Sequence, residues 1–261
     1  IWTTELKPPD RSTNRISFEH AIPLVLNQTW FEKRVPRFFM RHIREFWDLN
    51  DDLEVVLWDD AECDQFMREH WGDHPIYPIY RGGQFGPLKT DIFRYCLIYT
   101  RGGYYCDISK GVLTRWTALH PADAPGVVSY EKNHILLPFD DDPLLFDYPQ
   151  NYVANWAFGF CPQHPFLIQV INQIVKNAPR FTDVCFHYVK NAIISFTGPG
   201  VFTKCFHDYV ASESGPEIST LGIDFHGYGK MNLRGSRLRF WSKPSYKKER
   251  DKAISISARE N

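Results

Sequence analysis

The chain has 261 residues, 43% of them hydrophobic and 16% aromatic, which is enough to bury one sizeable core and excludes a disordered or fibrous protein. Its 30 basic and 31 acidic residues leave a formal net charge of −1. We therefore predict no nucleic-acid partner, because no overall positive field is present to attract phosphates. No window approaches 18 consecutive apolar residues, which argues against an integral membrane protein.

Short apolar runs alternate with segments of helical periodicity along most of the chain. The clearest helix repeats apolar residues between Phe166 and Val175, with Pro165 in its first turn and Pro179 just beyond its end. In chain order we predict strand 22–26, helix 36–47, strand 53–58, a helix after Asp60, loop 74–86, helix 88–99, strand 104–107, strands 126–130 and 156–160, and helix 166–175.

This alternation predicts an α/β fold with a mostly parallel central sheet in a single domain. We assign that domain to residues 22–242 and treat residues 1–21 as an N-terminal extension. Residues 243–261 are polar, and we expect them to form a solvated or frayed C-terminal tail.

An aspartate and an arginine share one face of the predicted helix 88–99. Asp91 and Arg94 are three residues apart, and the helix leads through Gly102-Gly103 into a strand that ends at Asp107. Ligands of open α/β sheets bind outside the carboxyl ends of strands, where one carboxylate can hold Mg²⁺ or Mn²⁺ together with substrate phosphates. The pattern favours a ligand site, and a surface ion pair of little energetic value is the alternative.

A set of ordered segments resembles one enzyme family. The segments are Leu26–Trp30, Val56–Asp60, Asp91 with Arg94, Gly102–Asp107, Asn155 with Phe158-Gly159, and Thr197–Gly200. They resemble the DXD-containing glycosyltransferases of the Och1 mannosyltransferase and α1,4-galactosyltransferase type, glycosyltransferase family 32. The resemblance covers roughly Ile22 to Phe206. It implies a GT-A-like nucleotide-sugar-binding fold, a UDP- or GDP-sugar donor, Mn²⁺ or Mg²⁺, and transfer with retention of configuration.

The resemblance also implies roles for individual residues. It assigns donor binding to Thr29, Trp30, Asp91, Arg94, Tyr105 and Asp107, and catalysis to Asp91, Arg94, Asp107 and Asn155. Trp30 would stack on the nucleobase, since an aromatic face suits a flat base, and a plain packing role is an equal alternative for this residue. A carboxylate and a guanidinium would hold sugar hydroxyls, while Asn155 would face the reacting sugar.

The chain departs from the family at the D-x-D motif itself. It reads Asp107-Ile108-Ser109, so a neutral hydroxyl stands where the family has its second carboxylate. Such a site should bind a divalent ion more weakly, because the Coulombic attraction of one carboxylate is missing. His226 could complete a metal site with Asp107 and Ser109, although an ordinary loop histidine is the more common case.

Two other segments match these motifs less well. Asp140-Asp141-Asp142 formally satisfies D-x-D, but it lies between two prolines without the preceding Gly-Gly strand, so a solvated loop is the better interpretation. Gly235-Ser236 is a looser match to the region that contains His226.

Other chemistries have weaker support. The histidine pair His70 and His74 has Gly72 between its members and lacks the glutamate of a zinc-protease helix. No G-x-S-x-G elbow, phosphate-binding P-loop or C-x-x-C pair is present in the sequence.

We therefore predict a metal-dependent retaining glycosyltransferase that moves a hexose to a glycan, glycolipid or other hydroxyl acceptor. The alternative is a nucleotide-sugar-binding or scaffold protein whose degenerate D-x-D motif has weakened catalysis. The resemblance implies a Golgi or other secretory-pathway lumen, with a possible membrane anchor outside these residues, or the cytoplasm for a bacterial or viral protein.

Overall fold

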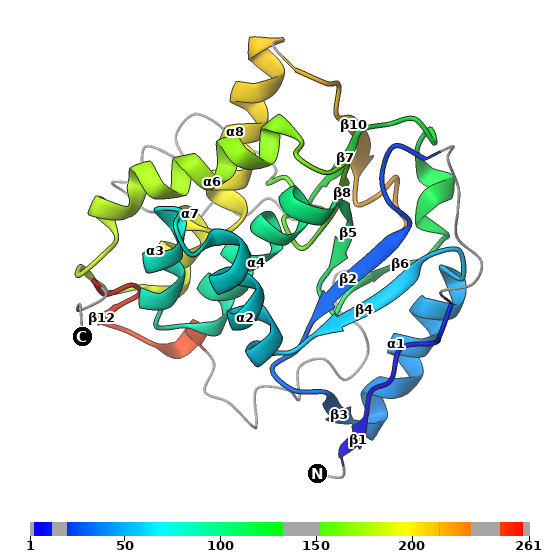
Figure 1. Cartoon of the computed structure of the whole chain (residues 1–261), viewed down its shortest axis with the longest axis horizontal. Helices are drawn as coiled ribbons and strands as arrows, with labels where there is room; N and C mark the ends of the chain where they lie inside the picture. Colours follow the sequence, from blue (N-terminus) through cyan, green and yellow to red (C-terminus); the bar gives the residue numbers. More distant parts are fainter. Residues whose placement is uncertain (1–2, 12–19, 133–151, 214, 231–245, 258–261) are drawn as a thin grey trace.

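The computed structural model describes residues 3–11, 20–132, 152–213, 215–230 and 246–257 (Figure 1). The predicted D-x-D alternative Asp140–Asp142 and the Gly235-Ser236 match lie outside these residues. The strands are β1 Thr3–Glu5, β2 Val25–Thr29, β3 Arg34–Pro36, β4 Glu54–Trp58, β5 Gly103–Cys106, β6 Gly111–Val112, β7 Gly126–Tyr130, β8 Ala157–Phe160, β9 Cys185–Phe186, β10 Ser219–Ile223, β11 Gly229–Lys230 and β12 Lys252–Ala253. The helices are α1 Arg37–Leu49, α2 Asp60–Trp71, α3 Ile76–Gly82, α4 Gly86–Arg101, α6 Pro165–Asn177, α7 Val189–Phe196 and α8 Pro199–Ser212, with 3₁₀ helices η2 Trp116–Leu119, η3 Ala178–Arg180 and η5 Tyr246–Lys248.

The central sheet has six strands in the order β10-β7-β8-β5-β2-β4. Strand β8 runs antiparallel to both of its neighbours, and the other adjacent pairs are parallel. The prediction of an α/β fold with a mostly parallel sheet is therefore confirmed. The carboxyl ends of β2, β4, β5, β7 and β10 meet at one edge of the sheet, and β8 begins at that same edge.

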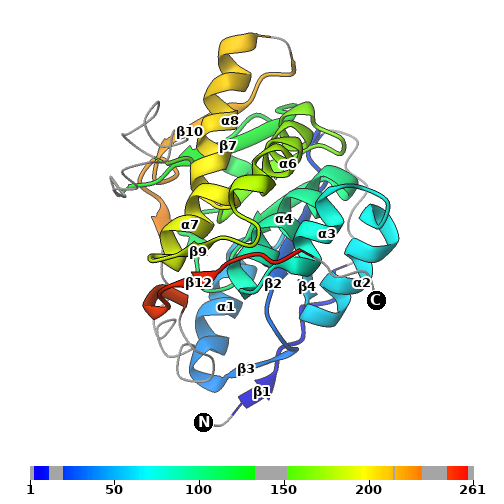
Figure 2. The ribbon, with the colours of Figure 1, turned by 90° about the vertical axis from the view of Figure 1, so that its left-hand side faces the viewer.

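Helices cover both faces of the sheet (Figures 1 and 2). Helix α1 packs on one face with Leu26, Tyr104 and Val127 in one buried cluster. Helices α2, α4, α6, α7 and α8 pack on the other face, where Tyr105 and Phe158 belong to a second cluster. Burial of these apolar side chains on two faces is the main stabilising contribution to the domain. Within the described residues, no helix is both long and apolar enough to cross a membrane.

The first strand of the central sheet begins later than the sequence predicts. We predicted residues 22–26, and β2 spans Val25–Thr29, because Pro23 has no backbone N–H to donate and the polar Asn27 and Gln28 are buried within the strand. Trp58 Nε1 donates to Asn27 Oδ1 at 3.0 Å, and Trp47 Nε1 donates to Gln28 Oε1 at 2.6 Å. These bonds compensate the burial of the two amides, so a polar segment can form a core strand.

Two glycines join α4 to β5 and set the direction of the strand. Gly102 and Gly103 have φ of 69° and 99°, a backbone region that side chains disfavour. A Cβ on Gly102 would lie 2.7 Å from Cδ of Pro162, and one on Gly103 would lie 2.7 Å from the carbonyl oxygen of Val25. The predicted helix end at these glycines is confirmed. The tight turn directs β5 so that its carboxyl end lies at the sheet edge where the strands β2, β4, β7 and β10 also end.

The proline-rich segment 74–86, predicted as a loop, contains helix α3. Ile76, Ile79 and Tyr80 are buried at helical spacing in this segment, and Pro78 lies in the first turn, where a missing N–H costs little. Its prolines and glycines suggested a loop, but burial of this short apolar face favours the helix.

Part of the predicted polar tail packs against the domain. Strand β12 pairs with β9, and Ile254 and Ser255 are both fully buried. Gln84 N–H donates to the Ile254 carbonyl at 2.9 Å, and Asp183 N–H donates to the Ser255 carbonyl at 2.9 Å. The expectation of a solvated or frayed tail is thus wrong for residues 252–257, because backbone pairing and one buried isoleucine outweigh their polar composition.

Candidate functional site

Helix α4 and the carboxyl end of β5 bring together the predicted Asp91, Arg94 and Asp107. Arg94 Nη2 lies 3.4 Å from Asp91 Oδ1 and 3.1 Å from Asp107 Oδ1, so one guanidinium connects the two carboxylates. The Arg94 and Asp91 side chains are almost entirely buried, whereas a quarter of the Asp107 side chain is exposed. The surface ion pair considered for Asp91 and Arg94 is therefore wrong, because both residues are buried at the end of the sheet.

The residue before β8 completes this charged cluster. Asn155 Nδ2 donates to Asp91 Oδ1 at 3.0 Å, and the Asn155 carbonyl accepts from Arg94 Nη1 at 2.7 Å. Thr197 Oγ1 donates to Asp91 Oδ2 at 3.2 Å. Because β8 is antiparallel, its amino end meets the carboxyl end of β5, so Asn155 reaches the cluster from the residues that precede its strand.

Tyr105 connects the cluster to strand β2. Its hydroxyl donates to Asp107 Oδ1 at 3.1 Å and lies 2.9 Å from Thr29 Oγ1. The Arg94 guanidinium carbon lies 4.6 Å from the centroid of the Tyr105 ring, a cation–π distance. The predicted Thr29 thus lies beside the site, and these contacts fix the orientation of Asp107.

The other predicted site residues have different surroundings. Trp30 is 9% exposed and packs edge-on against Phe39 with ring centroids 6.2 Å apart, while its Nε1 donates to the Arg34 carbonyl at 3.0 Å. Ser109 is buried two residues after Asp107. The side chain of His226 is exposed on a turn in the left-handed conformation. Base stacking by Trp30 and metal binding by Ser109 and His226 stay predictions.

Two charged residues near Asp107 were missed by the sequence analysis. Glu131 follows β7 at the same sheet edge and is 5% exposed. Lys110 N–H donates to the Asp107 carbonyl at 2.9 Å, and its ammonium lies 4.4 Å from the centroid of the Trp156 ring. The position of Glu131 directly after an apolar strand is the same signal that identified Asp107, and it could have been recognised in the sequence.

Burial shifts the pKa values of these groups in opposite directions. It raises the pKa of Asp91 to about 7, against the Arg94 charge, which lowers it. Burial also raises the pKa of Glu131, although the Lys110 charge opposes this effect. The pKa of Lys110 is lowered by burial, and the negative charges of Asp107 and Glu131 act against that change. These five groups, Asp91, Arg94, Asp107, Lys110 and Glu131, therefore form one electrostatic system.

The Asp91 shift predicts a pH-dependent affinity for the donor sugar. Below about pH 7 Asp91 takes up a proton and loses the charge with which it would accept sugar hydroxyls, so nucleotide-sugar affinity should rise about tenfold from pH 6 to pH 8. The free energy of unfolding changes in the opposite sense. Because the pKa of Asp91 is higher in the folded than in the unfolded chain, the stability falls as the pH rises from 3.8 to about 7. Calorimetric titration of the nucleotide sugar and of the free nucleoside diphosphate at both pH values would measure the effect. An identical pH response for both ligands, or its persistence in Asp91→Asn, would contradict the assignment.

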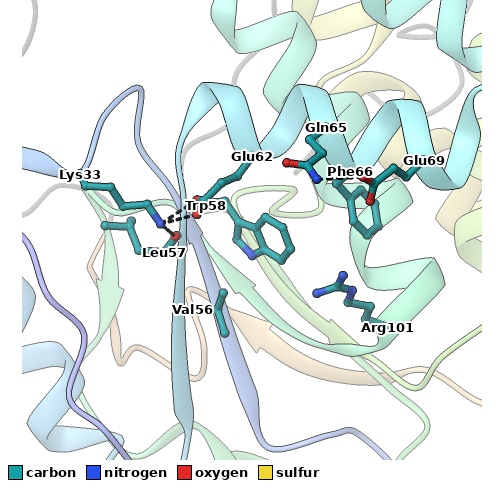
Figure 3. A pocket seen from close by; sticks show the side chains of 9 residues that line it. All are labelled: Lys33, Val56, Leu57, Trp58, Glu62, Gln65, Phe66, Glu69 and Arg101. Atoms are coloured by element: carbon teal, nitrogen blue, oxygen red, sulfur yellow. Dashed lines mark hydrogen bonds and ion pairs between the residues drawn. The ribbon is translucent and has the colours of Figure 1, made fainter.

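A separate pocket of about 310 Å³ lies at the open edge of β4, beneath α2. Figure 3 shows Lys33 paired with Glu62 at one end and Arg101 at the other. The Arg101 guanidinium lies 5.1 Å from the centroid of the Trp58 ring. No residue of the charged cluster lines this pocket. The pocket is therefore separate from the charged cluster around Asp107.

The fold and the position of the charged cluster can be compared with those of known proteins. A mostly parallel sheet has buried carboxylates, an arginine and an asparagine at the carboxyl end of its strands, where ligands of open α/β sheets bind. The solved structure described as "PaToxG Glycosyltransferase" has a similar fold, with a TM-score of 0.51, 15% identity and coverage of 73% of this chain and 71% of that one. The prediction of a GT-A-like glycosyltransferase fold is thereby confirmed.

Sequence comparisons support a more particular relationship. The family model "Glycosyltransferase sugar-binding region containing DXD motif" matches residues 36–125. The chain is 29% identical to "Inositol phosphoceramide mannosyltransferase 3" of Schizosaccharomyces pombe over 187 residues, which are 69% of this chain and 43% of that protein. It is 25% identical to "Initiation-specific alpha-1,6-mannosyltransferase" of Candida albicans over 77% of this chain and 59% of that protein. These matches confirm the resemblance to glycosyltransferase family 32. The chain spans about half the length of the curated relatives it matches.

Proposed function

We propose that this chain transfers a hexose from a nucleotide-sugar donor to a hydroxyl acceptor with retention of configuration. The observation that carries the proposal is the Arg94 guanidinium held between Asp91 and Asp107 at the carboxyl end of β5. The names of the relatives favour mannose as the sugar, so GDP-mannose is the first donor to test. The family match over residues 36–125 includes all three residues.

In the proposed reaction the chain orients the donor and stabilises developing charge. Asp91 accepts hydrogen bonds from hydroxyls of the donor sugar. The positive charge of Arg94 attracts the oxygens of the sugar and of the diphosphate. The bond between the anomeric carbon and the phosphate oxygen breaks through an oxocarbenium-like transition state. The acceptor hydroxyl forms the new bond on the same face, and its proton passes to the departing phosphate. No protein nucleophile takes part in this scheme.

A divalent cation would have few charged protein ligands at this site. Among the described residues, no three His, Cys, Asp or Glu side chains are grouped as metal ligands. Mg²⁺ and Mn²⁺ often take only one or two carboxylates and complete their coordination with substrate phosphates and water. Asp107 and the buried Ser109 hydroxyl fit that limited role, and His226 is the proposed third ligand. Such a cation would supply charge stabilisation for the leaving diphosphate.

Restoring the family carboxylate should strengthen divalent-ion binding. Ser109→Asp adds a second negative charge close to Asp107 in a buried position, so without metal the variant should melt at a lower temperature than the unmodified protein. Mn²⁺ should raise its melting temperature more than that of the unmodified protein, and donor hydrolysis should reach half its maximal rate at lower Mn²⁺. Thermal unfolding with Mn²⁺ titration measures this, with Ser219→Asp on β10 as the control for an added carboxylate. Equal Mn²⁺ responses in both variants would contradict a metal site at Ser109.

The activity itself can be tested with purified protein and a panel of donors. We expect hydrolysis of GDP-mannose, or of another GDP- or UDP-hexose, and transfer to a mannoside or an inositol-containing glycolipid, with the sugar retained in its α configuration. Product configuration is read by NMR of the anomeric proton. Protein that is folded and binds no nucleotide sugar in this panel would overturn the proposal.

The degenerate motif supports a second candidate function. Ser109 in place of the second carboxylate fits a protein that binds nucleotide sugars and no longer transfers them efficiently. Tight donor binding without hydrolysis or transfer, combined with hydrolysis gained in Ser109→Asp, would favour this candidate.

The acceptor and location follow from the relatives by analogy. The relatives are named as mannosyltransferases that act on inositol phosphoceramide or initiate α1,6-linked mannose, so a glycolipid or glycan acceptor is proposed. A secretory-pathway lumen, with the Golgi as its first site to examine, is the corresponding proposed location.

A further inference from the structure

Lys110 is held at the site by contacts on two sides. Its backbone N–H closes the turn onto the Asp107 carbonyl at 2.9 Å, and its ammonium lies 4.4 Å from the centroid of the buried Trp156 ring. Trp156 in turn packs against Phe225, with ring centroids 5.4 Å apart. The lysine side chain is thus held over an aromatic ring at the sheet edge and does not extend freely into solvent.

Three charged side chains act on the Lys110 ammonium. Asp107 and Glu131 attract it, and Arg94 repels it. Arg94 is already bound to both aspartates and to the Asn155 carbonyl. Lys110 directly follows Ser109, the neutral residue that stands where the family motif has its second metal-binding carboxylate.

We infer that the Lys110 ammonium binds the diphosphate of the nucleotide-sugar donor. The inference rests on the proposed function, since it specifies how that site recognises its donor. Lysine suits this role because it is a compact point charge that binds phosphate from many directions. The diphosphate would add to the negative charges of Asp107 and Glu131 that already attract the ammonium, and Trp156 would keep the side chain oriented.

The inference makes diphosphate binding partly independent of divalent ions. A D-x-D site attracts the donor phosphates through a bound cation, whereas a fixed ammonium attracts them directly. GDP or UDP should therefore bind in the presence of a chelator, and a neutral residue at position 110 should weaken that binding. Removing the charge of Glu131 should have the opposite effect, because one negative charge that repels the diphosphate is then absent.

The test is calorimetric titration of GDP, UDP and the corresponding nucleosides in EDTA. Lys110→Met should weaken diphosphate binding about 10- to 100-fold and change nucleoside binding less than about twofold, as expected for one charge-assisted contact. Lys110→Arg should retain most of the affinity, and Glu131→Gln should increase it. Lys89→Met is the control, because Lys89 is a half-buried lysine paired with Asp64 at 2.8 Å, outside the cluster.

The outcomes separate this inference from the proposed function. An unmodified protein that binds neither GDP nor UDP, with or without Mn²⁺, would overturn both. Diphosphate binding that is unchanged in Lys110→Met, or weakened equally for the nucleosides, would overturn only the inference about Lys110. Lys110→Arg guards against a misfolded lysine variant, since it keeps the positive charge and should keep most of the diphosphate affinity.

Discussion

Asparagine in place of Asp107 is expected to lower the rate of sugar transfer about 100- to 1000-fold, the scale for loss of one preorganised charged group at a transition state. Asp107 accepts from Tyr105 and pairs with Arg94 at 3.1 Å, so its charge positions the guanidinium as well as the donor. The free energy of unfolding should fall by only about 1 kcal/mol, because the side chain is partly exposed and Arg94 keeps Asp91 and a carbonyl as partners. Initial rates and urea unfolding measure the two effects.

The matched control for this substitution is Asp48→Asn. Asp48 is 80% exposed and lies 3.8 Å from Arg11, so neutralising it changes the net charge equally without touching the cluster. It should leave both rate and stability nearly unchanged. If Asp107→Asn keeps most of its turnover, Asp107 does not have the assigned role.

Trp30→Ala is expected to produce the largest loss of stability, about 3–5 kcal/mol, which is typical of a buried tryptophan reduced to alanine. The side chain packs against Phe31 and Phe39 and donates to the Arg34 carbonyl, so a cavity and the loss of one hydrogen bond would both result. If its remaining exposed face also stacks on the nucleobase, nucleotide affinity should fall about five- to 150-fold in addition. Urea unfolding and calorimetric titration measure the two quantities separately.

Phe39→Ala distinguishes packing from stacking. Phe39 belongs to the same buried cluster and is 4% exposed, so its truncation should also destabilise the fold by several kcal/mol. Nucleotide affinity that falls in Trp30→Ala and not in Phe39→Ala would support stacking. Equal affinities in the two variants would assign Trp30 to the core alone.

The elements with strong local patterns were predictable from the sequence. Helix α6 has prolines at both ends and a regular apolar face, and Asp59 caps α2 in a capping box with Glu62, so propensity and tertiary packing agree. The antiparallel direction of β8 was not predictable, because strand direction depends on how the chain returns to the sheet rather than on strand composition. Helices α7 and α8 were not predicted, and the sequence motif 197–200 lies at the junction between them.

The candidate site also has a part that local sequence patterns predict and a part that depends on long-range contacts. Asp91 and Arg94 share a helix face, and Asp107 ends a strand, so local spacing predicted that they would lie at a ligand edge. The hydrogen bonds of Asp91 to Asn155 and Thr197 join positions 64 and 106 residues apart, and no local pattern contains that information. The role of Lys110 depends on Trp156, whose proximity arises only when β8 pairs with β5.

The pairing of residues 252–257 with distant segments bears on the order of events during synthesis. These residues bridge Gly83 and Thr182 through Ser255, and Ile256 N–H donates to the Gly82 carbonyl at 3.0 Å. The bridge lies immediately before α4, the helix that carries Asp91 and Arg94. When only residues 1–250 have emerged from the ribosome, all the charged residues of the cluster are present, but the contacts made by residues 252–257 are not. The first turn of α4 should therefore become protected from proteases late, after residues 252–257 have emerged from the ribosome.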